Sequence, residues 1–191
     1  MIRSTLVTVV LAGASAAASA HIGHDDVSGF ASGALHPLSG LDHVVAMVAV
    51  GLWAAFLGRK AMRLLPIVFP ALMVLGGSLG MAGVALPGVE TAIALSAVAL
   101  GLLIAGQVRP PLAVAAAIVG AFALFHGHAH GAELPQAAGP IAYAAGFVLS
   151  TLALHGIGMV AGVAVQRLAT PLVARLLGSG IAMVGLAFLA G

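Results

Sequence analysis

The chain has 191 residues, of which 62% are hydrophobic and only 6% are charged, with a formal net charge of +2. Soluble domains carry about 25% charged residues, so this composition excludes a water-soluble globular protein and predicts a membrane protein. The few basic residues form no run with interleaved aromatic residues, which argues against nucleic acid as a partner. Cysteine is absent, which excludes disulfides, thiolate metal sites and thiol catalysis.

The first 20 residues have the pattern of a cleaved signal peptide. Arg3 provides the positive charge, residues 6–11 form the apolar core, and Ala18-Ser19-Ala20 is a small-residue cleavage site. The alternative, an uncleaved first span, is less favoured because the apolar core is short and is rich in alanine and serine. Cleavage would leave residues 21–36 as a short periplasmic segment, in which two histidines are candidates for capturing a metal ion: His21 and His24.

Six apolar stretches follow, each close to the roughly 20 residues that a membrane-spanning helix needs. They cover residues 37–57, 64–86, 89–107, 110–133, 138–165 and 171–190. The predicted fold is therefore all-α, a polytopic membrane bundle of six transmembrane helices, with residues 37–191 as the transport domain. Only Pro87-Gly88 separates the second stretch from the third, which predicts a tight helical hairpin.

Basic residues beyond the predicted signal peptide fall in every second gap between these stretches. Since lysine and arginine mark the cytoplasmic loops of membrane proteins, this alternation predicts periplasmic N- and C-termini. It also predicts a multi-pass protein of the bacterial inner membrane, with its histidines mainly on the outer side. The basic residues are Arg59, Lys60, Arg63, Arg109, Arg167 and Arg175.

The first cluster of candidate metal ligands begins at His36. Pro37 suits the first position of a helix, which would place His43 on nearly the same face as His36 and about 10 Å deeper. Asp42 within an apolar run is unfavourable in lipid, so it should face the bundle interior, and Met47 lies one turn further. The alternative, a histidine that only packs helices together, is less favoured because an aspartate stands beside His43.

The second cluster covers residues 126–133. If the segment is helical, His126, His130 and Glu133 share one face, and His128 points elsewhere. If it is unwound, which its glycines permit, the three histidines alternate onto one side. Either geometry can converge imidazoles and a carboxylate on one ion, although histidine-rich tracts also occur as solvated loops.

Two further positions lie outside these clusters. His155 and Met159 are one turn apart in the fifth stretch, where they either continue a metal pathway or serve packing. Glu90 lies at the outer end of the third stretch, where it either attracts ions or is only an interfacial carboxylate; the second interpretation is slightly favoured.

The ligand types restrict the ion. Imidazole with carboxylate suits first-row divalent transition metals, whereas Mg²⁺ prefers mostly oxygen ligands. Ligands that gather on the outer side argue for uptake. The inside-negative potential favours cation entry by about 2.3 kcal/mol per charge for each 100 mV, so a facilitator needs no other energy source.

Two motifs also resemble those of the HupE/UreJ family, and the resemblance extends over essentially the whole chain. The motifs are His36-Pro-x2-Gly40-x-Asp42-His43-x3-Met47-x3-Gly51 and Phe125-His126-Gly127-x-Ala129-His130-Gly131-x-Glu133. The resemblance implies an inner-membrane nickel permease, linked to cobalt in some members, that is associated with hydrogenase or urease maturation. It further implies transport roles for five residues, with Glu133 a weaker candidate and His128 at a variable position: His36, Asp42, His43, His126 and His130.

Two other functions remain as alternatives. An intramembrane zinc hydrolase could hold Zn²⁺ with an open water position and use Glu133 as general base, but its ligands should lie at one depth. A metal sensor or accessory subunit usually has a cytoplasmic output domain. The leading hypothesis is therefore a non-enzymatic permease for Ni²⁺, with Co²⁺ or Zn²⁺ as further candidate ions and no catalytic residues or catalytic cofactor.

Overall fold

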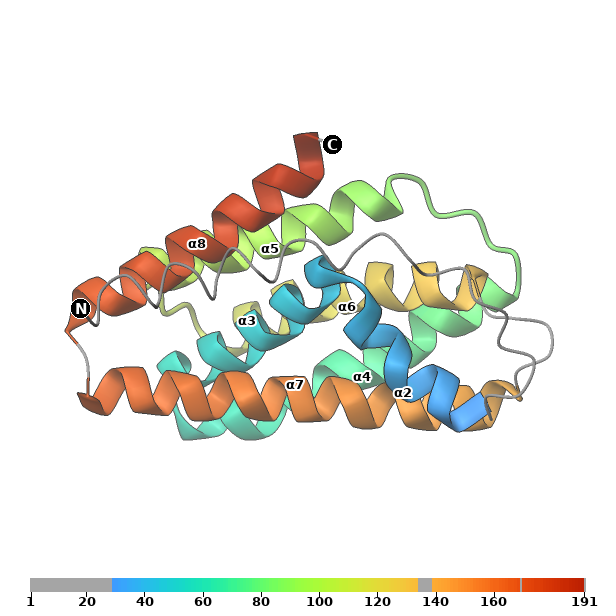
Figure 1. Cartoon of the computed structure of the whole chain (residues 1–191), viewed down its shortest axis with the longest axis horizontal. Coiled ribbons are helices and arrows are strands. Elements are labelled where there is room, and N and C mark those ends of the chain that lie inside the picture. Colours follow the sequence, from blue (N-terminus) through green and yellow to red (C-terminus); the bar gives the residue numbers. More distant parts are fainter. Residues whose placement is uncertain (1–28, 134–138, 169, 191) are drawn as a thin grey trace, which may run out of the picture.

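The computed structural model describes residues 29–133, 139–168 and 170–190 (Figure 1). The predicted signal peptide and the candidates His21 and His24 lie outside this part. All of its regular elements are α-helices, which confirms the predicted all-α class. The helices are α2 (Gly29–Ser39), α3 (Leu41–Leu57), α4 (Arg59–Met81), α5 (Val89–Ala105), α6 (Leu112–Ala132), α7 (Pro140–Leu168) and α8 (Pro171–Ala190).

Four of these helices, α4, α6, α7 and α8, are long and apolar enough to cross a membrane. The bent pair α2 and α3 passes the same test together, which raises the number to five. Helix α5 is apolar but has 17 residues, so it is about 26 Å long, slightly short of the hydrocarbon core. The protein is therefore an integral membrane protein. Of the six predicted spans, the described part supports four or five.

The predicted helix start at Pro37 is wrong. Helix α2 begins at Gly29, and Pro37 lies inside its last turns, where it removes one backbone hydrogen bond. Gly40 then adopts an extended conformation, with φ −110° and ψ 122°, and α3 continues at an angle of 85° to α2. As a result, His36 and His43 lie on two different helices and not on one face of a single helix.

The predicted hairpin of the second and third stretches is also wrong. Helix α4 ends at Met81, and residues 82–88 lead away from it to α5. Helix α4 packs mainly against α6, and α5 packs mainly against α8, while α2 and α3 both pack on α7 (Figure 1). The loop contains glycines with positive φ at Gly83 and Gly88, a conformation that glycine adopts without strain.

Glycines allow the helix backbones to touch. A Cβ atom on Gly76 of α4 would overlap the carbonyl oxygen of Leu124 in α6, and one on Gly158 of α7 would overlap that of Val48 in α3. Close contact of this kind is a main source of helix association in lipid, where the hydrophobic effect gives little drive. The two glycine pairs spaced four residues apart, Gly76 with Gly80 and Gly158 with Gly162, therefore serve helix packing.

The two ends of the bundle differ in chemistry. At one end, the ends of α3, α5 and α7, the link after α5 and the start of α8 line a cavity of about 280 Å³. Trp53 donates a hydrogen bond there to the Val108 carbonyl at 3.1 Å. The basic residues predicted to be cytoplasmic lie on this side, near the starts of α4 and α8, near the end of α7 and, for Arg109, in the link between α5 and α6. The histidine motifs lie at the opposite end (Figure 1).

Candidate metal centre

Residues of α2, α3, α5 and α6 enclose a cavity of about 220 Å³ at the end of the bundle that carries the histidine motifs. The fold brings both motifs into this one space, although they stand far apart in the chain. This outer cavity is lined by His36, Ser39, Gly40, Asp42, His43, Glu90, Ala129, His130 and Glu133.

One group of three potential ligands combines residues of α2 with residues at the end of α6. One ligand atom each from His36, His130 and Glu133 lies within 4.8 Å of the other two. The His36 ring contacts the His130 ring edge-on, at 4.7 Å between centroids. This contact depends on the bend at Gly40, because the bend turns α2 toward the end of α6. Two imidazoles and a carboxylate at this separation suit a first-row divalent ion.

Asp42 orients the imidazole of His43. The Asp42 carboxylate lies 2.9 Å from Nδ1 of His43, so Nδ1–H donates to the carboxylate and Nε2 keeps a free lone pair. That Nε2 is buried and has no hydrogen-bond partner within residues 29–133 or the other described ranges. A carboxylate behind an imidazole is the usual support of a metal-binding histidine. His43 is 4.6 Å from His130 and 5.4 Å from His126, measured between ring centroids.

Gly40 makes room for this pair. A Cβ atom at Gly40 would lie 2.6 Å from Oδ1 of Asp42 and 2.9 Å from Nδ1 of His43. Asp42 also stands in the first turn of α3, where the positive end of the helix dipole favours a carboxylate. The glycine of the first motif therefore breaks the helix and leaves space for the side chains that follow it.

The second motif is helical to Ala132, which agrees with the helical one of its two predicted geometries. Its glycines do not unwind it. A Cβ atom on Gly127 or Gly131 would instead overlap carbonyl oxygens of α4, so both glycines are required for close packing of α4 and α6. His126 and His130 consequently lie one turn apart on the face toward α3, and both are buried.

His128 points away from the cavity, as the helical geometry predicts. Its Nε2–H donates to the carbonyl oxygen of Val84 at 2.7 Å, in the link between α4 and α5. Its ring is 8% exposed, and it does not line the cavity. The structure therefore gives His128 an anchoring contact and does not bring it to the other histidines.

Four other side chains that the sequence predicts as ligands or pathway residues lie deeper in the bundle than this cavity. Nδ1–H of His126 donates to the Phe122 carbonyl at 2.9 Å, and Nε2 has no partner in the described part of the chain. His155 is fully buried in α7. Met47 is fully buried one turn beyond His43, and Met159 packs partly buried against the apolar core. None of these side chains lines the outer cavity.

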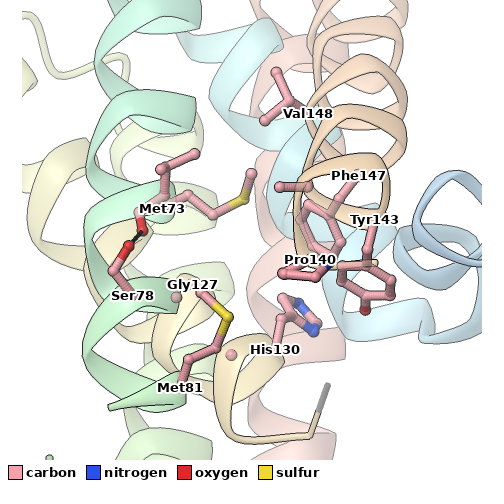
Figure 2. A pocket seen from close by; sticks show the side chains of 13 residues that line it. Met73, Ser78, Met81, Gly127, His130, Pro140, Tyr143, Phe147 and Val148 are labelled. Carbon is pink, nitrogen blue, oxygen red and sulfur yellow. Dashed lines mark hydrogen bonds between the residues drawn. The ribbon is translucent and has the colours of Figure 1, made fainter. Parts of the chain in front are cut away.

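A smaller cavity of about 80 Å³ lies behind His130, between α4, α6 and α7. Figure 2 shows the His130 ring between Met81 on one side and the rings of Tyr143 and Phe147 on the other. Phe147 lies 4.4 Å from His130 between ring centroids. Both nitrogens of His130 are buried and have no partner among the residues that the structure describes, which costs about 1–3 kcal/mol for an unsatisfied polar group. Such a cost is typical of a side chain retained for binding.

Glu90 is the residue of the cavity that sequence reasoning undervalued. It stands in the first turn of α5 and lines the same space as Asp42 and Glu133. These are all the carboxylates in the described part of the chain, and all of them line one cavity. The rarity of carboxylates among apolar residues was a usable signal, but only the packing of α5 beside α3 shows that they converge.

Comparison with known proteins identifies the family of the chain. The family model described as HupE / UreJ protein matches residues 9–188. The chain is 50% identical over 177 residues to Protein HupE of Rhizobium leguminosarum bv. viciae, and the alignment covers 91% of both chains. No solved structure matches the chain. With a family match over nearly its whole length, and with both motifs facing one cavity, the chain belongs to the HupE/UreJ family.

Proposed function

We propose that the protein is an inner-membrane permease that imports Ni²⁺ from the periplasm to the cytoplasm, with Co²⁺ as a second candidate ion. One observation carries this proposal. All the described carboxylates, together with His36, His43 and His130, converge on a single cavity at the end of the bundle opposite the basic residues. Membership in the HupE/UreJ family and the apolar helix bundle support the same function.

The side chains around the cavity suit stepwise loss of water from the ion. Glu90 and Glu133 are exposed, and their negative charge raises the local concentration of cations. His36 is half-buried, and His130 beyond it is buried with neither ring nitrogen bonded to any described residue. An ion that moves from carboxylates to imidazoles exchanges hydration water for nitrogen ligands that first-row metals prefer. The membrane potential then favours movement inward.

The permease is preferred over the two alternative functions. A zinc hydrolase would keep its ligands at one depth around an open water position. Here, imidazole nitrogens without a partner among the described residues continue inward at His126 and His155. An accessory role would not require a line of unpartnered ligands through the bundle. The imported ion would serve the maturation of hydrogenase or urease.

Uptake of radiolabelled Ni²⁺ tests this function. Cells that lack their own nickel uptake would express the chain, its His43→Ala variant or its His128→Ala variant, matched for abundance in the membrane. We expect uptake by the parent and by His128→Ala, and loss of uptake in His43→Ala. Unlabelled Ni²⁺ or Co²⁺ should inhibit uptake by the parent more strongly than unlabelled Zn²⁺ does. Parent cells that take up no more than empty cells would contradict a permease, and metal analysis of the purified protein would then test the zinc-hydrolase alternative.

A further inference from the structure

Unpartnered imidazole atoms also occur in the middle of the bundle, beyond the outer cavity. His155 of α7 has no exposed surface, and neither of its ring nitrogens has a hydrogen-bond partner in the part of the chain that the structure describes. Burying polar atoms without partners is unfavourable, and an apolar side chain of similar size would fill this space without that penalty. His155 therefore offers two free ligand atoms at a depth that the carboxylates do not reach.

A line of ring contacts leads from the outer cavity to His155. The His43 ring is 5.4 Å from His126, His126 is 5.7 Å from Phe69, and Phe69 is 5.0 Å from His155, measured between centroids. Beyond His43, none of these side chains is more than 1% exposed. The Phe69 ring contacts both inner histidines and meets His155 edge-on, so it links His126 to His155 through ring contacts.

Two more atoms that could bind a metal ion lie near the contact between Phe69 and His155. The Thr151 hydroxyl donates to the Met73 sulfur at 3.9 Å, and both side chains are buried. Thr151 stands one turn before His155 on α7, and Met73 stands one turn beyond Phe69 on α4. The surroundings of His155 thus contain an imidazole, a hydroxyl and a thioether in an otherwise apolar space. Imidazole is the strongest of these ligands for a first-row divalent ion.

We propose that His155 is an inner binding station for the transported ion, reached from His126 when the Phe69 ring moves aside. This inference rests on the proposed permease function. In this scheme the ion passes from His126 to His155 past the Phe69 ring, which contacts both, so passage has an outer step and an inner step. The outer step uses the carboxylate-lined cavity, and the inner step uses a ligand without any carboxylate, from which a cation is released more readily.

Separate measurements of binding and transport test the proposal. Purified full-length protein would be reconstituted in liposomes as the parent or as His155→Leu, with equilibrium Ni²⁺ binding and Ni²⁺ influx measured on the same preparations. We expect His155→Leu to keep Ni²⁺ binding at the outer cavity and to lose influx by about tenfold or more. Influx at the parental rate in His155→Leu would overturn the proposal while leaving the permease function intact. No influx with the parent would instead contradict the permease function.

A chemical probe decides the case in which His155→Leu does not fold. The chain has no cysteine, so His155→Cys introduces a single thiol. We expect Ni²⁺, but not Mg²⁺, to slow its alkylation by N-ethylmaleimide. The matched control is Leu154→Cys, the buried neighbour on α7, whose alkylation should not respond to Ni²⁺. Equal alkylation rates of His155→Cys with and without Ni²⁺ would overturn the inner station.

Discussion

The His36 ring in α2 lies 4.7 Å from the His130 ring in α6, edge-on, although the two residues belong to different sequence motifs. The 85° bend between α2 and α3 is what brings them together. A continuous helix through Pro37 would have carried His36 outward along the axis of α3, away from α6. The contact makes one composite ligand group out of two motifs.

If His36 and His130 bind the same ion, their substitutions should not act independently. His36→Ala and His130→Ala should each weaken equilibrium Ni²⁺ binding by about tenfold or more. The double variant should bind little worse than the weaker single variant, because residues that act as a unit are not additive. Titration of the four purified proteins with Ni²⁺ gives the coupling. Fully additive effects would mean that the two histidines serve separate sites.

His128 and His130 stand two residues apart on one helix and should behave differently. His130→Ala should abolish Ni²⁺ uptake, because His130 lines the cavity and neither of its nitrogens bonds another residue of the described ranges. His128→Ala should retain uptake and lower the free energy of unfolding by about 1 kcal/mol, since it removes one hydrogen bond to Val84. Uptake assays and thermal denaturation in detergent measure the two effects. Loss of uptake in a stable His128→Ala protein would show that His128 does bind the ion.

Replacement of Gly40 even by alanine should reduce Ni²⁺ uptake. The added Cβ atom would press on the Asp42 carboxylate and on Nδ1 of His43, so the pair must shift. We expect Gly40→Ala to reduce Ni²⁺ uptake by about tenfold, comparable to loss of a supporting ligand contact, with little change in membrane abundance. Gly180→Ala is the control, because a Cβ atom there meets open space. Equal uptake by the two variants would show that the orientation of Asp42 and His43 is not critical.

Asp42 should act through both its charge and its hydrogen bond. Asp42→Asn keeps an oxygen that can accept from Nδ1 of His43, whereas Asp42→Ala removes the acceptor as well as the charge. Uptake should therefore be lower in Asp42→Asn than in the parent, and it should be abolished in Asp42→Ala. Immunoblots of membrane fractions would establish that insertion is unchanged. Undiminished uptake by Asp42→Ala would exclude the outer cavity as the transport site.

Glu90 should influence capture of the ion. Its side chain is exposed at the cavity, so Glu90→Gln should raise the KM for Ni²⁺ uptake by a few-fold, about 1 kcal/mol or less, through the lost charge. The same variant should show a weaker dependence of uptake on ionic strength, because salt screens attraction between exposed charges. Uptake at two salt concentrations measures both effects. Identical salt dependence in parent and variant would assign Glu90 no part in capture.

Local periodicity allowed part of the site to be predicted. His126 and His130 share a helix face because they are four residues apart. His128 is two residues from each of them and therefore lies on another face. The relation of His36 to His43 was mispredicted, because Pro37 is compatible with a helix start as well as with a helix end. Only the extended backbone of Gly40 distinguishes the two.

The sequence by itself determined that the chain is a helical membrane protein with basic residues at one end and histidines at the other. These are properties of composition and of spacing along single helices, which local chemistry sets. Only the tertiary structure decided that α4 pairs with α6 and α5 with α8, and that Glu90 joins Asp42 and Glu133. Such relations depend on which backbones can approach at glycines and on the angle after Gly40, and both arise from contacts between residues distant in the chain.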